Sequence, residues 1–139
     1  MIVLDTNVLS ELMRPAPAQQ VIDWFDRMPA SQAFITSVTV AELLCGVAKM
    51  PPGQRKAAMS TEVAATLNED FCGRALAFTY EAAVEYADIV SSRERQGLPI
   101  SIPDAQIAAI CRLHGADIAT RNVKDFAETG VRVIDPWAG

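Results

Sequence analysis

The chain has 139 residues, of which 50% are hydrophobic and 21% are charged, and its formal net charge is −5. This length predicts a single domain over residues 1–139 with a core of its own, and the composition argues against a disordered protein. The acidic balance counts against strong non-specific binding of DNA or RNA, because nucleic-acid-binding proteins more often carry a basic face. It favours a basic protein partner instead.

Membrane and disulfide classes are disfavoured by the sequence. No apolar stretch reaches the length of a transmembrane helix, and the apolar run at residues 1–4 has no basic region before it. We therefore expect a cytoplasmic protein with no membrane association. The three cysteines show no CxxC spacing, so free thiols are expected. Cys45 and Cys111 lie in apolar helical stretches and are predicted to be buried.

The first half of the chain alternates short apolar runs with helical patterns. Residues 2–4 are continuously apolar, which is typical of a buried strand. A short helix over residues 7–13 is ended by the prolines that follow it. The pattern then predicts a helix over 18–28, a strand over 33–36 and a helix over 39–49, before a Pro-Pro-Gly turn at 51–53.

The second half continues the alternation and ends with two more strands. Gly97 and Gly115 are placed as helix C-terminal caps, and Pro103 as a helix start. The predicted elements are helices over 54–70, 80–96 and 103–114 and strands over 75–78, 118–120 and 131–134. Strands that alternate with helices predict an α/β fold around a parallel sheet.

Four polar residues stand where a strand passes into a helix or within a helix's first turn: Asp5, Glu42, Asp104 and Asn122. If the strands are parallel, all four lie at the same edge of the sheet, where α/β proteins place their functional sites. Crowded carboxylates repel each other, and a hard cation relieves that repulsion. Carboxylate and amide oxygens suit Mg²⁺ or Mn²⁺. The pattern therefore predicts a metal-dependent enzyme.

Each of these residues also has a structural explanation. Asp5 can cap the helix that follows its strand. The spacing of a capping box occurs at Thr39–Glu42, Ser101–Asp104 and Asn122–Asp125. Taken singly, each residue is better explained as a cap; only their joint placement favours a metal site, and one carboxylate can serve both purposes. The basic residues Arg93 and Arg95, at the end of a predicted helix, are expected to be solvated, although they could touch an RNA backbone.

At these same residues the chain resembles the PIN-domain family. The segments 1–9, 39–43, 103–109 and 119–126 resemble the family's four motifs in order and spacing. The total length is similar to that of the VapC-type toxins of bacterial toxin–antitoxin pairs. The ending Asp135-Pro136-Trp137 resembles the FitB-like branch of that group. The resemblance covers essentially the whole chain.

The resemblance implies a PIN-like three-layer fold, with about five parallel strands and helices on both sides. It implies a Mg²⁺- or Mn²⁺-dependent ribonuclease that forms a homodimer. The partner would be a VapB- or FitA-like antitoxin, through which alone operator DNA is bound. Carried over by motif, Asp5 and Asp104 are primary metal ligands, and Glu42 binds the metal directly or through the attacking water. Thr120 supports the site with its hydroxyl.

Asn122 departs from the family's pattern, because many relatives carry Asp at this position. An amide brings no negative charge; Asp125, one turn later, either compensates or only caps. We therefore expect one tightly bound ion. Two other functions stay open: a PIN-like regulatory module with little nuclease activity that acts as a DNA-binding complex with its antitoxin, and a phosphatase with Asp5 as nucleophile. The second is disfavoured because Asn7 stands where a second Asp is needed.

Overall fold

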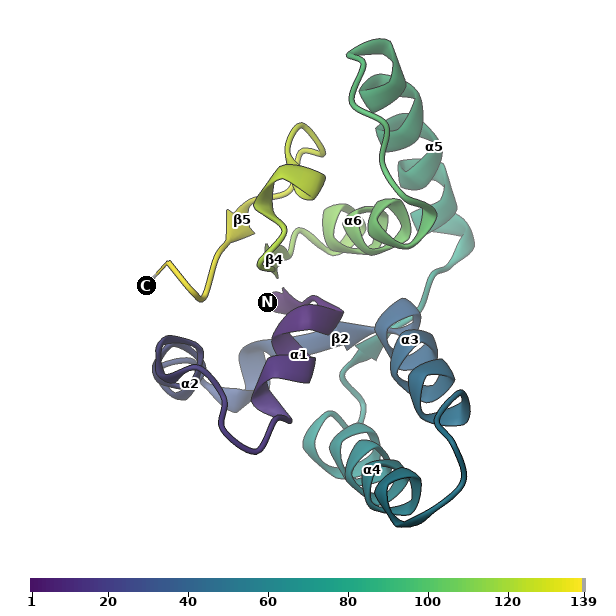
Figure 1. Ribbon diagram of the computed structural model, residues 1–139. Helices are drawn as coiled ribbons and strands as arrows, with labels where there is room; N and C mark the ends of the chain where they lie inside the picture. The colour runs from purple at the N-terminus through teal and green to yellow at the C-terminus, as the bar shows by residue number, and fades with distance from the viewer. Residues whose placement is uncertain (139) are drawn as a thin grey trace.

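Across residues 1–138, which the structure describes, five short parallel strands form a sheet in the order β3-β2-β1-β4-β5. The structure is a computed structural model, and Figure 1 traces it from end to end. The strands are β1 (Ile2–Leu4), β2 (Ala33–Thr36), β3 (Ala75–Leu76), β4 (Asp117–Ala119) and β5 (Val133–Ile134). The α/β fold with a parallel sheet is thereby confirmed.

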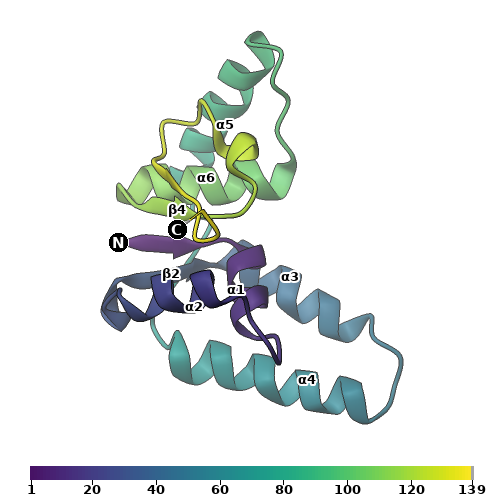
Figure 2. The same ribbon diagram turned by 60° about the vertical axis from the view of Figure 1, so that its left-hand side comes forward.

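Helices cover both faces of this sheet, as the predicted three-layer arrangement requires. The helices are α1 (Thr6–Leu12), α2 (Gln19–Asp26), α3 (Ser37–Ala48), α4 (Gln54–Ala65), α5 (Tyr80–Arg95) and α6 (Ile102–His114). In Figure 2, α5 and α6 lie above the sheet, and α1, α2 and α4 lie below it. Helix α3 continues directly from β2 and contacts both α1 and α6. Shorter helical turns are η1 (Ala30–Gln32), η2 (Thr66–Asp70) and η3 (Val123–Phe126).

The core divides into two halves because successive strand residues point to opposite faces. Val3 and Ile118, which are paired across β1 and β4, belong to the cluster under α5 and α6. Leu4 and Ala119, the next pair along, belong to the cluster with α1 and α2. All four side chains are fully buried. The continuous apolar run of residues 2–4 is thus explained by a strand that is covered on both faces.

The strand order places a topological switch point at the carboxyl ends of β1 and β4. From β1 the chain builds β2 and β3 on one side, and then crosses through α5 and α6 to build β4 and β5 on the other. The backbone amide of Asp5 donates to the carbonyl of Ala119 at 2.9 Å, so the two strand ends are joined there. Ligand sites in open α/β sheets lie at such a crevice.

Several predicted boundaries differ from the observed ones, for local reasons. Helix α3 begins at Ser37, because the hydroxyl of Thr36 caps it by accepting from the backbone amide of Thr39 at 3.2 Å. Since β2 ends there, β3 has no strand to pair with beyond Leu76, and the amide of Phe78 donates to Ser37 Oγ instead. The helix predicted over 54–70 closes with the π-helical turn η2.

Two predictions about burial were wrong. Cys45 is exposed on α3, whereas Cys111 is buried as predicted, and burial raises the pKa of its thiol. Arg93 is not solvated: it is only 4% exposed, and its guanidinium donates to backbone carbonyls. No helix within residues 1–138 is both long and apolar enough to span a bilayer.

Candidate active site

The four predicted site residues line one cleft of about 540 Å³ at the switch point. Asp5 comes from the end of β1, Glu42 from α3, Asp104 from the first turn of α6, and Asn122 from the loop after β4. The joint placement that the sequence predicted, four polar groups at one edge of a parallel sheet, is therefore what the fold produces.

Asp5 is both a helix cap and a carboxylate of the cleft. Its Oδ1 accepts from the backbone amide of Thr6 at 2.8 Å, which caps α1. Its Oδ2 accepts from the hydroxyl of Thr120 at 2.8 Å and from the amide of Asn7 at 3.3 Å. The side chain has little exposed surface, since Asp5 is 5% exposed. Three donors therefore hold this carboxylate in one orientation.

Thr120 and Asn7 form the support around Asp5. The Thr120 hydroxyl accepts from the backbone amide of Asn122 at 3.0 Å, and it lies 3.3 Å from the donating amide of Asn7. The other end of the Asn7 side chain accepts from the backbone amide of Arg121 at 3.2 Å. Asn7 is thus engaged at both ends as a structural group, and an amide is not a general acid. This counts against the aspartyl-phosphatase alternative.

Glu42 is directed to α1 and does not cap its own helix. The hydroxyl of Thr6 donates to Glu42 Oε1 at 2.7 Å and lies 3.0 Å from the hydroxyl of Thr39. The capping box expected at Thr39–Glu42 is therefore wrong, because Thr36 performs the capping and α3 starts two residues earlier. Glu42 is exposed at the rim of the cleft.

Asp104 lies in the first turn of α6, where Ser101 is the cap. The Ser101 hydroxyl accepts from the backbone amide of Asp104 at 3.3 Å, so the capping expected at this position is made by the serine. The left-handed residue Gly115 ends the helix, as predicted. Asp104 is half-buried and lines the same cleft as Asp5.

Asn122 lines the cleft but does not cap η3, so the capping expected from it was wrong. Its backbone is held by Thr120, and its side chain is exposed. Asp125, one turn later, is exposed, and its negative charge helps to raise the pKa of Asp104. Asp125 therefore exerts on Asp104 a negative charge of the kind that Asn122 lacks.

Burial and mutual repulsion make the carboxylates costly to ionise. Burial raises the pKa of Asp5, and the charges of Asp104 and Glu42 raise it further, against hydrogen bonds from Thr120 and Thr6. Burial also raises the pKa of Asp104, to which Asp125 and Glu42 add, against Ser101 and Arg93. Acidic groups that disfavour each other's charge are the groups that a cation stabilises.

The donor set fits a hard divalent cation in chemistry and in charge. Every donor is an oxygen or an amide, which suits Mg²⁺ or Mn²⁺ and not zinc. Within residues 1–138, no three His, Cys, Asp or Glu side chains are close enough to form a ready-made ligand set. Glu42 is hydrogen-bonded to Thr6 instead. Mg²⁺ is commonly held by one or two carboxylates and keeps several waters, so it does not need such a cage.

The raised pKa values predict how stability depends on pH. The ordinary pKa of Asp5 and Asp104 is 3.8, and folding raises both pKa values. Such a carboxyl contributes its full stabilisation when the pH is below its ordinary pKa. The contribution is lost as the pH rises through the pKa of the folded protein. We expect Asp5→Asn to gain stability relative to the parent as pH rises from about 4 towards 7. Urea unfolding at several pH values measures this, and Mn²⁺ should stabilise only the parent. Parallel stability curves would contradict it.

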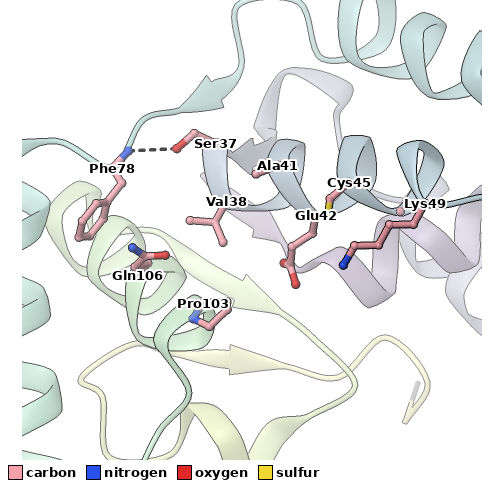
Figure 3. A pocket seen from close by; sticks show the side chains of 10 residues that line it. Ser37, Val38, Ala41, Glu42, Cys45, Lys49, Phe78, Pro103 and Gln106 are labelled. Atoms are coloured by element: carbon pink, nitrogen blue, oxygen red, sulfur yellow. Dashed lines mark hydrogen bonds between the residues drawn. The ribbon is translucent and has the colours of Figure 1, made fainter.

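A second depression of about 670 Å³ adjoins the cleft, and Glu42 lines both. It lies between α3 and α6. Figure 3 shows the side chains of Glu42 and Lys49 extending from α3 into this groove, with Pro103 and Gln106 of α6 on the opposite side. Glu42 therefore stands between the cleft and a neighbouring groove that contains a lysine.

The cleft also contains residues that motif reasoning did not assign. Thr6 and Asn7 directly follow Asp5, so their position beside the first strand was a usable signal. Arg121 and Trp137 line the cleft from the loops after β4 and β5, and nothing local in the sequence pairs them. Glu11 also lines it, but it is held by the amide of Ala18 at 2.9 Å and is structural.

The chain is similar to known proteins of one family along almost its whole length. The sequence matches the PIN domain family over residues 2–131. It is 36% identical over 137 residues to the VapC ribonuclease Y4jK of Sinorhizobium fredii, covering 99% of this chain and 98% of that one. It is 36% identical to the toxin FitB of Neisseria gonorrhoeae, covering 99% of each chain. The structure of FitAB bound to an IR36 DNA fragment aligns with a TM-score of 0.93 at 36% identity, over 99% of this chain and 96% of that one. The chain belongs to the PIN-domain family.

Proposed function

We propose that this chain is the ribonuclease toxin of a VapBC-type toxin–antitoxin pair and that it hydrolyses RNA phosphodiester bonds with the help of Mg²⁺ or Mn²⁺. The observation that carries the proposal is the convergence of Asp5, Glu42 and Asp104, from three separate segments, on one cleft. Two of these carboxyls have raised pKa values. The relatives that bear the names VapC ribonuclease and FitB toxin support the same assignment.

In the mechanism we propose, Asp5 and Asp104 hold the cation, and Glu42 holds it directly or through a water. When bound, the cation supplies a Lewis acid and a water of lowered pKa. Thr120 and the amide of Thr6 keep Asp5 from rotating. Glu42 Oε1 is engaged by Thr6, so Oε2 would accept the proton of the attacking water as the new P–O bond forms. The ester P–O bond would break, and the leaving oxygen would take a proton from solvent.

In this mechanism Asn122 contacts the substrate and not the cation. Its amide group donates a hydrogen bond to a non-bridging phosphate oxygen, where developing negative charge needs a donor. An Asp in its place would repel that oxygen unless a second cation lay between them. The chemistry of this position therefore favours one ion, with Asp125 contributing charge only at a distance.

We further propose that an antitoxin partner blocks this site and carries the DNA binding of the complex. One solved relative is FitAB bound to a DNA fragment. The net charge of −5 disfavours direct contact between this chain and a DNA backbone and favours a basic partner. The alternative, a regulatory module with little nuclease activity, is favoured by the missing charge at Asn122 and by the acidic net charge of the chain.

RNA cleavage by the purified chain without its partner separates these functions. We expect cleavage with Mg²⁺ or Mn²⁺, none with EDTA, and none from Asp104→Asn. The matched control is Asp117→Asn, because Asp117 begins β4 at the opposite edge of the sheet and should tolerate the change. A folded chain that binds an antitoxin but cuts no RNA with any ion would instead support the regulatory module.

A further inference from the structure

Arg121 and Trp137 form a stacked pair at the cleft. The guanidinium carbon of Arg121 lies 5.0 Å from the centroid of the Trp137 ring, within the range of a cation–π contact. Both residues line the cleft that contains the carboxylates. Arg121 follows β4 and Trp137 follows β5, so neighbouring strands deliver the two side chains to the same edge of the sheet.

The pair is tied to the carboxylate cluster. The backbone amide of Arg121 donates to Asn7 Oδ1 at 3.2 Å, and the other end of that amide side chain donates to Asp5 Oδ2 at 3.3 Å. The ring of Trp137 packs against the buried cluster under α1 and α2, and its backbone amide is held by Asp135 at 2.9 Å. The backbone of Arg121 is therefore tied to Asp5 through Asn7, and the ring of Trp137 positions its guanidinium.

Arg121 is also the unpaired cation of the cleft. The other arginine that lines it, Arg14, lies 3.3 Å from the carboxylate of Glu11. Among residues 1–138, the guanidinium of Arg121 makes no ion pair and no side-chain hydrogen bond, although Arg121 is exposed in a cleft with four carboxylates. Its charge contributes, after hydrogen bonding from Ala18 and the charge of Arg14, to lowering the pKa of Glu11. A guanidinium stacked through one face keeps its N–H edges available to an incoming acceptor.

We propose that Arg121, held on Trp137, binds a phosphate of the RNA strand beside the scissile one and so positions the substrate over the carboxylates. This rests on the proposed ribonuclease function. A cleft that holds Asp5, Glu42 and Asp104 repels a polyanion, so a fixed cation at its rim is needed to hold the strand. The planar guanidinium matches two phosphate oxygens, which a lysine does not.

Kinetics and binding test the proposal together. Wild type, Arg121→Gln and Arg121→Lys are compared for KM and kcat on one RNA oligonucleotide, and for binding of its 2′-O-methyl analogue in EDTA over a range of salt. We expect Arg121→Gln to raise KM roughly tenfold or more with little change in kcat. The slope of log K against log salt should fall by about 0.7, the value for one phosphate contact on a single strand. Arg121→Lys should keep the slope and recover part of the affinity.

Trp137→Leu tests the stacked geometry. Without the ring the guanidinium loses its fixed position, so the cost of Arg121→Gln should be smaller in the Trp137→Leu background than in the parent. If Arg121→Gln raises KM equally in both backgrounds, Trp137 does not position the guanidinium. If Trp137→Leu does not fold, the single Arg121 variants decide. Arg132→Gln is the matched control, because Arg132 is an exposed arginine 3.4 Å from Asp117, at the opposite edge.

The outcomes distinguish the proposed role of Arg121 from the proposed ribonuclease function. If wild type cleaves RNA and Arg121→Gln keeps the parent's KM and salt slope, the role of Arg121 is overturned and the ribonuclease function stands. If wild type cuts no RNA, the ribonuclease function fails, and the salt slope in EDTA still decides whether Arg121 contacts phosphate. A loss of antitoxin binding with unchanged RNA binding would assign Arg121 to the protein partner.

Discussion

Asp5→Asn is expected to lower ion-dependent RNA cleavage at least about 100-fold while the protein stays folded. The amide keeps one oxygen, which still accepts from the backbone amide of Thr6, so the cap of α1 survives. Its NH₂ group takes the place of Oδ2, where it can donate to the Thr120 hydroxyl but no longer accepts from Asn7. What disappears is the negative charge, on which the affinity for a divalent cation depends. Burial and the neighbouring acids raise the pKa of Asp5, so the substitution removes a charge that is costly in the folded protein.

Two measurements on the same sample check this result. Initial rates of RNA cleavage with Mn²⁺ give the activity, and urea unfolding gives the free energy of unfolding. Activity should fall while stability at neutral pH is kept or rises, which is the trade-off expected of a functional site. Wild-type cleavage by Asp5→Asn would reduce Asp5 to a helix cap. The activity of Asp117→Asn should match that of wild type.

Arg93→Met is expected to lower the free energy of unfolding by roughly 2–4 kcal/mol. The guanidinium of Arg93 donates to the carbonyls of Leu98 and Pro99, just after α5, and to those of Asp125 and Ala127 in and after η3. A fully buried carbonyl left without a donor costs about 1–3 kcal/mol. These hydrogen bonds are only partly buried, so water reaches some of the carbonyls and the total stays below the sum for four. Met fills a similar volume, so the loss of unfolding free energy reflects the missing hydrogen bonds and not a cavity.

The matched control is Arg95→Met, two residues later on the exposed face of the same helix. Its unfolding free energy should stay within about 0.5 kcal/mol of the parent. Arg93→Lys keeps the charge but loses the planar fork, so it should recover only part of the stability. Urea midpoints at one pH measure all three variants. Equal midpoints for the Met variants at positions 93 and 95 would mean that water already satisfies these carbonyls.

The positions of Asp5, Glu42, Asp104 and Asn122 could be predicted because they depend on local rules. A strand that ends in a polar residue, a capping serine or threonine, and a glycine after a helix are all visible within a few residues. The parallel sheet then follows from the alternation of strands and helices, and it brings the four residues to one edge.

The errors concern contacts between distant segments. The sequence pattern of Arg93 is that of any basic residue at a helix end, and its burial depends on loops that close over it from α6 and η3. Glu42 is drawn to Thr6, a partner 36 residues away, which no helix-capping rule anticipates. Helix α3 has more apolar residues than the sheet covers, so Cys45 and Leu44 are exposed, Leu44 at 51%.

The hydrogen bond between Thr120 and Asp5 joins residues that are 115 positions apart. During translation at about 5–20 residues per second, roughly 6 to 23 seconds separate the synthesis of the two. Until β4 emerges, β1 lacks one of its two neighbours, and the carboxylate at its end lacks the hydroxyl that orients it. A nascent chain without β4 therefore has no complete cleft, and we expect the proposed ribonuclease activity to appear only after β4 has been synthesised.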